Sequence, residues 1–221
     1  MIVTIDGPVA AGKTTIAREL AIRLGFTLLD TGAIYRCVAL ASRRLEIAWD
    51  DEPRLAELAR EIDVVFELRD GTNHVILDGA DVSSAIREPE ISEGASIVSA
   101  LPKVRQALLE LQRAMAAQGR IVVEGRDTGT VVFPQADAKF FLTADPEVRA
   151  RRRHRELVER HDAQSQEEVL AALKERDTRD TTRAVAPLVA ADDARVIDST
   201  NRDVEEILDE VSEHLRSLGA G

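Results

Sequence analysis

The chain has 221 residues, of which 44% are hydrophobic and 31% are charged, which is enough apolar material for the core of one domain with insertions. Its formal net charge of −11 argues against general binding to nucleic acid or to an anionic membrane, because a polyanion needs a basic face. A single cysteine, Cys37, excludes a disulfide framework within the chain, and the lack of a signal peptide or a long apolar run predicts a cytoplasmic enzyme.

The chain opens with a strand pattern at residues 2–6, which leads into the stretch GPVAAGKTT at residues 7–15. Residues 13–25 then carry apolar side chains at helical spacing and end in a glycine. Strand, glycine loop and helix form the context that a phosphate-binding P-loop requires. Four residues fit its spacing G-x-x-x-x-G-K-[ST]: Gly7, Gly12, Lys13 and Thr14.

A P-loop binds a nucleoside triphosphate through backbone N–H groups and the positive end of its helix. In that arrangement Lys13 reaches the β- and γ-phosphates, and the Thr14 hydroxyl binds Mg²⁺. The motif alone does not separate a switch, a motor and a kinase.

Further along the chain, short apolar segments predict four more strands of one buried parallel sheet. Helical patterns at residues 103–118 and 203–218 lie among these strands, and Cys37 is expected to be a small buried side chain on another helix. Alternating strands and helices predict an α/β fold with a doubly wound sheet, whose ligands bind at the carboxyl ends of the strands. The four strand segments are residues 26–29, 120–124, 138–142 and 194–198.

Residues 62–86 interrupt this alternation. They alternate apolar and polar side chains on either side of Asp70-Gly71, which predicts an antiparallel hairpin within a subdomain inserted between the second and third strands. Two interpretations remain open: a lobe that covers the substrate, or an appendage that only stabilises the fold.

Polar residues gather after the carboxyl ends of the predicted strands. Residues 149–160 alone hold six arginines, on a helix for which Asp145 and Pro146 are a suitable N-cap and first residue. A run of charges is usually a solvated helix face, but its place beside a strand end of an acidic protein favours a role in binding phosphate. The other such segments are residues 30–36, 125–130, 175–180 and 199–201.

These groups favour transfer of a γ-phosphoryl group to an acceptor that is itself a phosphate. Such a reaction needs two aligned substrates, many cations at one place and exclusion of water, for which an arginine-rich lid would serve. Two alternatives stay open: a P-loop kinase for another acceptor (UMP, AMP or a small alcohol), and an NTP-binding switch, although the base-reading motif N-K-x-D of GTPases is absent. Arginines from separate segments supply the cations: Arg36, Arg126, Arg176, Arg179 and Arg183.

Six stretches resemble, in order and spacing, the bacterial cytidylate kinases (CMP/dCMP kinases), which are nucleoside monophosphate kinases. The resemblance covers residues 2–200, and DTGAIYR and GRDTGTVVFP are its most specific parts. Val9-Ala10 stand where the family often has Ser-Gly, and Thr31 replaces a common serine while keeping the hydroxyl. The stretches are TIDGPVAAGKTT, LLDTGAIYR, ALPKVRQALLELQR, VEGRDTGTVVFP, KERDTRD and RAVAPLVAADDARVIDST.

The resemblance implies a monomer that transfers the γ-phosphoryl group of ATP to CMP or dCMP, with Mg²⁺, in pyrimidine nucleotide metabolism. It also implies a P-loop NTPase-type core with a five-stranded parallel sheet and helices on both faces, an NMP-binding insert with a small antiparallel sheet, and an arginine-rich lid. The implied divisions are residues 1–29, 102–148 and 167–221 for the core, 30–101 for the NMP-binding subdomain and 149–166 for the lid.

Site residues follow from the same resemblance. ATP is expected to bind at Gly7, Pro8, Val9, Ala10, Ala11, Gly12, Lys13, Thr14, Thr15 and Arg152, with Thr14 as the metal ligand. The catalytic residues are expected to be Lys13, Arg126, Asp127, Arg176 and Arg183. The acceptor is expected to bind through its phosphate at Arg36, Arg126 and Arg183, through its sugar at Tyr35, Arg176 and Asp180, and through its base at Ser96, Arg105 and Asp127. Thr31 is expected to be a further substrate-binding residue.

The base assignment is chemically consistent. Cytosine offers N4–H₂ as a donor and O2 and N3 as acceptors, so Asp127 can accept from N4 while Arg105 donates to the ring. Uracil carries an oxygen at the N4 position and would be repelled by Asp127.

Overall fold

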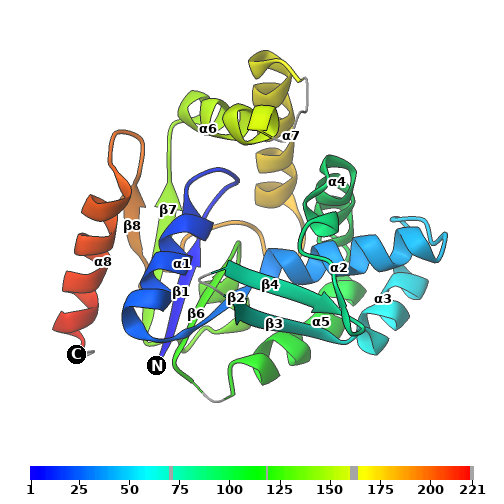
Figure 1. Cartoon of the computed structure of the whole chain (residues 1–221), viewed down its shortest axis with the longest axis horizontal. Coiled ribbons are helices and arrows are strands. Elements are labelled where there is room, and N and C mark those ends of the chain that lie inside the picture. The colour runs from blue at the N-terminus through cyan, green and yellow to red at the C-terminus, as the bar shows by residue number, and fades with distance from the viewer. Residues whose placement is uncertain (70–71, 118, 160–163, 220–221) are drawn as a thin grey trace.

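The computed structural model describes residues 1–69, 72–117, 119–159 and 164–219. Five strands form one sheet in the order β2-β6-β1-β7-β8, and each neighbouring pair is parallel. The carboxyl ends of these strands therefore meet at one edge, from which the P-loop rises (Figure 1). The strands are β1 (Ile2–Asp6), β2 (Thr27–Asp30), β6 (Ile121–Gly125), β7 (Ala138–Thr143) and β8 (Arg195–Asp198).

The predicted strands and the parallel α/β fold are confirmed, with strand bounds shifted by one residue at most. The expectation that all five strands are buried is wrong for β8, of which only Ile197 is buried while Val196 is 57% exposed. The physical reason is its position, because β8 is an edge strand that pairs on one side only, with β7.

Helices cover both faces of the sheet, and each face has its own apolar core. Side chains of α1 and α8 pack on one face with Val122, whereas α2 and α5 pack on the other with Ile121 and Val123. Successive residues of β6 thus serve opposite cores, as the period of a strand requires. Helix bounds are α1 (Lys13–Leu24), α2 (Thr31–Arg44), α5 (Pro102–Met115) and α8 (Val204–Ser217).

The predicted helices 13–25 and 203–218 agree with these bounds to within one residue, whereas α5 ends at Met115, before the predicted end of helix 103–118. Gly25 ends α1 in the left-handed conformation, with φ of 62°. Position 118, the last of the predicted helix 103–118, lies outside the described residues. Cys37 is fully buried on α2, as expected, and burial raises the pKa of its thiol to about 12.

The insertion between β2 and β6 carries a second, antiparallel sheet of order β3-β4-β5. Val64 pairs with Leu77 and Arg69 with Thr72, which confirms the predicted hairpin, although its turn at Asp70-Gly71 lies outside the described residues. The bounds are α3 (Glu52–Glu61), β3 (Val64–Arg69), β4 (Thr72–Leu77), β5 (Ala80–Asp81), the 3₁₀ turn η1 (Ala85–Arg87) and α4 (Pro89–Val98).

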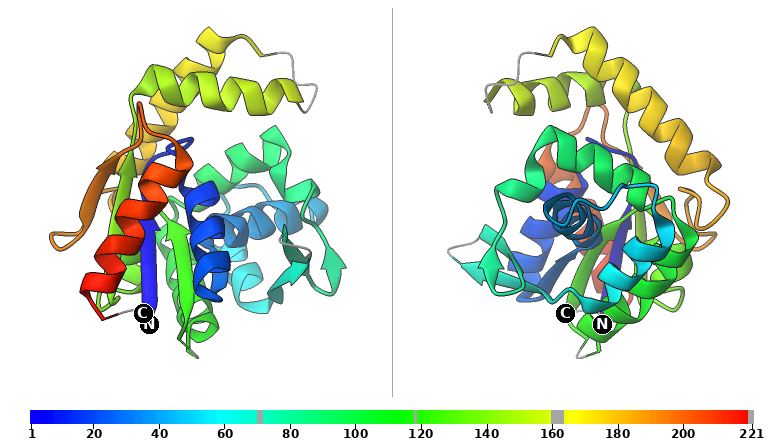
Figure 2. Two further views of the ribbon diagram at one scale, coloured as in Figure 1. Left: turned by 60° about the vertical axis from the view of Figure 1, so that its left-hand side comes forward. Right: turned by 90° about the vertical axis from the view of Figure 1, so that its right-hand side faces the viewer.

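Two helices, α6 (Pro146–Glu159) and α7 (Gln166–Thr182), form a pair above the carboxyl edge of the sheet (Figure 2). Leu157 of α6 and Val169 and Leu173 of α7 join them in a small apolar cluster. Asp145 is the predicted N-cap of α6, since its Oδ1 accepts a hydrogen bond from the Glu147 N–H at 2.8 Å. Positions 160–163 of the expected lid, Arg160 among them, lie outside the described residues.

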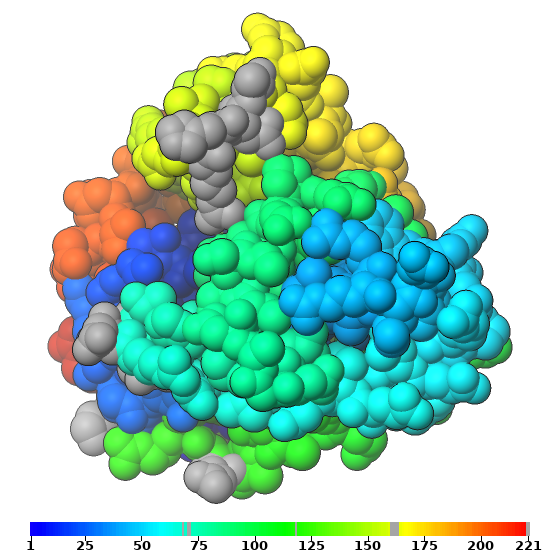
Figure 3. Space-filling model, turned by 45° about the vertical axis from the view of Figure 1, so that its right-hand side comes forward, coloured from blue at the N-terminus to red at the C-terminus, as the bar shows by residue number. Residues whose placement is uncertain are grey.

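The space-filling view in Figure 3 shows the yellow residues of α7 above the green residues of α4.

In the part of the chain that the structure describes, no helix combines the length and the apolar character needed to cross a membrane.

Helix α4 has no room for a side chain at Gly94. A Cβ there would lie 2.4 Å from Cε2 of Trp49, whose indole N–H donates to the Ala39 carbonyl at 3.3 Å. Glycine to alanine ordinarily stabilises a helix, but overpacking costs about 1–3 kcal/mol, so we expect Gly94→Ala to lower the free energy of unfolding. Urea denaturation measures this free energy of unfolding.

The matched control combines Gly94→Ala with Trp49→Leu. Removing the indole relieves the clash, so the double variant should be more stable than the sum of the two single effects indicates. A Gly94→Ala protein as stable as the wild type would contradict this packing.

Candidate active site

The P-loop is closed around its lysine. Lys13 is 6% exposed, and its Nζ donates to the Pro8 carbonyl at 2.7 Å. Gly7 has φ of 145°, and a Cβ there would lie 2.0 Å from the Leu142 carbonyl oxygen of β7, so only glycine allows this approach. Ala10 adopts φ of 58°, which shows that alanine occupies the left-handed conformation at this position. Burial lowers the pKa of Lys13, and the charge of Arg126 lowers it further.

Glu124, at the end of β6, faces the P-loop helix. The Thr14 hydroxyl donates to Glu124 Oε2 at 2.9 Å, and the Thr31 hydroxyl donates to the Glu124 carbonyl at 2.8 Å. Its other carboxylate oxygen, Oε1, is buried and has no hydrogen-bond partner among the described residues. Burial raises the pKa of Glu124 to about 7, and the nearby charge of Asp30 adds to the rise. This oxygen pair beside Thr14 is suited to a hard cation.

A cavity of about 390 Å³ lies between the P-loop, α2, α4 and the α6–α7 pair. It brings together most of the site residues that the sequence indicated: Val9, Ala10, Gly12, Lys13, Thr14, Thr15, Thr31, Tyr35, Arg36, Arg105, Arg126, Asp127, Arg176, Asp180 and Arg183. Five of the expected residues do not line it: Gly7, Pro8, Ala11, Ser96 and Arg152.

Guanidinium groups in this cavity are paired with carboxylates from strand and helix ends. Asp127 lies between Arg105 and Arg183, with the Arg183 contact at 3.0 Å. Elsewhere in the cavity, Arg126 contacts Asp180 at 3.1 Å and Arg36 contacts Asp30 at 2.6 Å. Each of these carboxylates compensates the charge of at least one nearby guanidinium group, so several arginines can lie close together in the fold.

Arg176 differs from the paired arginines. Its Nε is buried and has no hydrogen-bond partner among the described residues. Burial lowers the pKa of Arg176 to about 10, and the positive charge of Arg126 contributes to the lowering. Two close guanidinium groups of which one is incompletely bonded form a favourable place for a polyanion.

The end of the cavity near α5 is built around Arg105. Its guanidinium lies 5.5 Å from the centroid of the buried Tyr35 ring, and its Nη1 donates to the Ser99 carbonyl at 3.0 Å. Ser96 is buried behind this wall, where its hydroxyl accepts a hydrogen bond from Arg179 at 2.8 Å. Burial raises the pKa of Tyr35, so its hydroxyl stays protonated.

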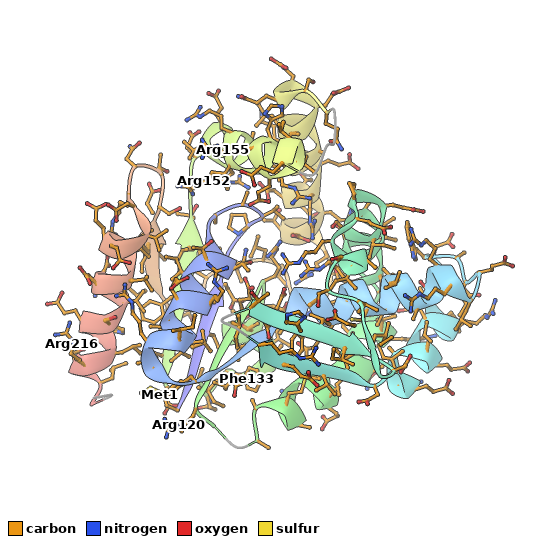
Figure 4. All side chains as sticks on the ribbon, in the orientation of Figure 1. Met1, Arg120, Phe133, Arg152, Arg155 and Arg216 are labelled. Carbon is orange, nitrogen blue, oxygen red and sulfur yellow. The ribbon has the colours of Figure 1, made fainter. Side chains whose placement is uncertain are left out.

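The arginine run on α6 divides into separate roles, which sequence alone did not indicate. Arg149 is buried and donates to the Val9 carbonyl at 3.3 Å and to Asp177 at 2.7 Å, so it holds α6 to the P-loop and to α7. Arg152 donates to the Ser199 hydroxyl and carbonyl, whereas Arg153 lines the cavity. Figure 4 labels Arg152 and Arg155 on α6.

Two further functional candidates were not assigned from the sequence: Asp6 and Glu124. Arg149 and Arg179 were expected among the phosphate-binding arginines, but neither lines the cavity. Asp6 and Glu124 end strands at the ligand edge, and that position is the signal that was available for them. The roles of Arg149 and Arg179 depend on contacts between helices, for which a single sequence carries no signal.

Comparisons of the sequence with known proteins agree on one family. The family model described as cytidylate kinase matches residues 3–217. A cytidylate kinase from Geobacter sulfurreducens is 49% identical over 98% of this chain and 93% of its own, and one from Actinobacillus succinogenes is 45% identical over the whole of both chains. A solved structure of an uncharacterized protein from Eubacterium ventriosum has a TM-score of 0.53 at 13% identity, covering 98% of each chain, which shows a shared fold.

The raised pKa of Glu124 predicts how stability depends on pH. From about pH 4.5, the ordinary pKa of the group, up to its folded pKa of about 7, the unfolded chain has lost this proton while the folded chain keeps it. Stability therefore falls as the pH rises through this window. Between pH 5 and pH 8, the free energy of unfolding should fall by about 1–3 kcal/mol less in Glu124→Gln than in the wild type. Urea denaturation with EDTA present measures this difference.

The exposed Glu147 offers a control, since Glu147→Gln should follow the wild-type pH profile. If Glu124→Gln and wild type lost equal stability over this interval, the protonation of Glu124 described here would be wrong.

Proposed function

This chain belongs to the cytidylate kinase family and transfers the γ-phosphoryl group of ATP to CMP or dCMP, and we propose how the residues of the cavity divide that reaction. The observation that carries the proposal is a single cavity of about 390 Å³ that joins a P-loop to the Arg105–Asp127–Arg183 cluster. A donor and an acceptor nucleotide bound there would present their phosphates to each other across Lys13, Arg126 and Arg176.

ATP binds along the P-loop, residues 7–15, through the backbone N–H groups at the start of α1. Lys13 leaves the Pro8 carbonyl and donates to the β- and γ-phosphates instead. Arg152, which bonds Ser199 beside the loop, lies beside the nucleotide. Helix α6 is held to the loop by Arg149, so its orientation is coupled to the conformation that receives the phosphates.

Mg²⁺ fits at Thr14 and Glu124. This ion prefers hard oxygen ligands. The hydroxyl oxygen of Thr14 is one, and the buried Oε1 of Glu124, which has no hydrogen-bond partner among the described residues, is another. When bound there, Mg²⁺ would neutralise part of the negative charge of the triphosphate. Because Glu124 keeps its proton up to about pH 7, binding of the cation would displace that proton.

The acceptor phosphate binds at Thr31, Arg36, Arg126 and Arg183. Arg36 and Arg126 now pair with Asp30 and Asp180, and a nucleotide phosphate would take over part of each guanidinium. Arg176, whose Nε has no hydrogen-bond partner among the described residues, completes this set of cations. It would stabilise the negative charge that develops on the phosphoryl group during transfer.

Cytosine is read by Arg105 and Asp127. Asp127 lies between two guanidinium groups, and its carboxylate accepts a hydrogen bond from the cytosine N4–H₂ and repels the oxygen that uracil carries there. Arg105 donates to the ring acceptors and is held in place by Tyr35 and the Ser99 carbonyl. Ser96, on α4, contributes to base binding through the hydrogen bond that its hydroxyl accepts from Arg179, when α4 approaches the base.

The sugar lies near Tyr35, Arg176 and Asp180, all of which line the cavity. Residues 30–101 act as the NMP-binding subdomain and residues 149–166 as the lid, which excludes water when it closes over both nucleotides. The remaining segments, residues 1–29, 102–148 and 167–221, form the core. We assign the chain as a monomer that acts on free nucleotides.

An assay of ADP release with four acceptors tests the proposal. We expect turnover of ATP with CMP and dCMP, much slower turnover with UMP and AMP, and little without an acceptor. Lys13→Ala should lose at least about 10²-fold in kcat with every acceptor, because it removes a cation from the transferring phosphates. The exposed Lys103 supplies the control, and Lys103→Ala should be as active as the wild type. ADP release that ignores added CMP would instead indicate an NTP-binding switch.

Asp127→Ala tests the assignment of the base-reading residue. Without the carboxylate, cytosine loses an acceptor and uracil loses a repulsive partner, so the ratio of kcat/KM for CMP to that for UMP should fall by at least about tenfold. Asp137→Ala removes an exposed carboxylate of similar size and should leave the ratio unchanged. An unaltered ratio in Asp127→Ala would show that another group reads the base.

A further inference from the structure

Asp6 is a buried carboxylate that the reaction described above does not use. It is the last residue of β1, directly before the P-loop, and its side chain faces the turn that follows β6. The residue is 5% exposed. Three donors of that turn satisfy both of its oxygens: the Thr128 N–H at 2.9 Å and the Thr128 hydroxyl at 2.8 Å on Oδ1, and the Gly129 N–H at 2.7 Å on Oδ2.

The turn lies directly against β1. A Cβ at Gly129 would be 2.9 Å from the Thr4 hydroxyl oxygen and 3.4 Å from Asp6 Oδ2, so glycine permits this contact. Thr128 is 1% exposed and begins the short π-helical turn η2 (Thr128–Val132). The two N–H groups bound by Asp6 belong to the residues immediately after Asp127. A displacement of this turn therefore moves the Asp127 carboxylate relative to Arg105 and Arg183.

We propose that Asp6 is the positioning residue for acceptor-base specificity: it fixes the turn that holds Asp127 at the cytosine-reading position. The inference rests on the proposed function of Asp127. A carboxylate is needed because all three partners are donors and both oxygens must accept. An asparagine of the same shape has one oxygen and one NH₂, so in either orientation at least one backbone N–H faces another donor.

Replacement of Asp6 should change recognition of the acceptor nucleotide rather than binding of ATP. Although Asp6 precedes Gly7, the P-loop has supports of its own that do not involve Asp6. Gly7 packs against the Leu142 carbonyl of β7, and the Ser199 hydroxyl donates to the Ala11 carbonyl at 2.9 Å. The turn after Asp127 has its backbone N–H groups bound by Asp6.

The test compares Asp6→Asn with wild type, using kcat and KM for ATP, CMP and UMP together with the melting temperature. The misplaced Asp127 should lower the CMP-to-UMP ratio of kcat/KM by about 10- to 100-fold and raise the KM for CMP, while the KM for ATP stays within about twofold. An unchanged ratio, with all rates lowered together as stability falls, would mean that Asp6 only stabilises the fold and would overturn the inference.

Thr4→Val is the matched control. Thr4 lies on the same face of β1 beneath the same turn, and its buried hydroxyl has no hydrogen-bond partner among the described residues. The variant therefore alters the packing under Gly129 without removing a bond, and its CMP-to-UMP ratio should equal that of wild type. A Thr4→Val protein that loses specificity as Asp6→Asn does would count against the hydrogen bonds as the cause.

Thr128→Val keeps the proposal testable should Asp6→Asn fail to fold. It removes one of the three bonds and leaves the carboxylate, so the ratio should fall by about two- to fivefold, and Thr128→Ser should restore it. A folded Thr128→Val with the wild-type ratio would overturn the inference. A wild type without CMP-dependent ADP release would refute the proposed function itself, which separates the two failures.

Discussion

Mutual repulsion of cations is the constraint on which this active site depends. Five of the arginines that line one cavity come from α2, α5, the residue after β6, α7 and the residue after α7, and without compensating charges they would repel one another. Carboxylates at the same sheet edge prevent this, because Asp30, Asp127 and Asp180 each contact at least one guanidinium. The net charge of −11 describes the chain as a whole, whereas the cavity carries the cations that a pair of nucleotides needs.

This arrangement also explains how binding can proceed without large rearrangement of charge. A guanidinium that gives up part of a carboxylate contact for a phosphate exchanges one charge-assisted hydrogen bond for another, so the cation is never left buried alone. Arg176 is the exception: among the described residues its buried Nε has no hydrogen-bond partner and, unlike Arg36, whose Nε is also unpartnered, it forms no ion pair with a carboxylate. A site whose cations are mostly paired with carboxylates, but in which Arg176 is not, favours binding of an anion beside that group.

The central strand connects the two halves of the site. Its last residue, Asp6, holds the turn after Asp127, and the P-loop begins at the next residue, so the proposed base-reading turn and the P-loop both adjoin the end of one buried strand. Helix α6 is joined to the same loop through Arg149. The contacts that position the reacting groups are therefore buried, while the groups themselves face the cavity, which is how a site is preorganised.

The sequence by itself determined the features that depend on local spacing. Strand and helix periodicity gave the five-stranded α/β core and the hairpin, and the P-loop was visible because its glycines and lysine lie within a few residues of each other. Only the tertiary structure decided which cation meets which anion. Arg126 and Asp180 are 54 positions apart, Asp6 and Thr128 are 122 apart, and the Ser96 hydroxyl is turned toward Arg179 from another helix. Such pairs depend on how strands and helices come together in space, and neither periodicity nor composition records that.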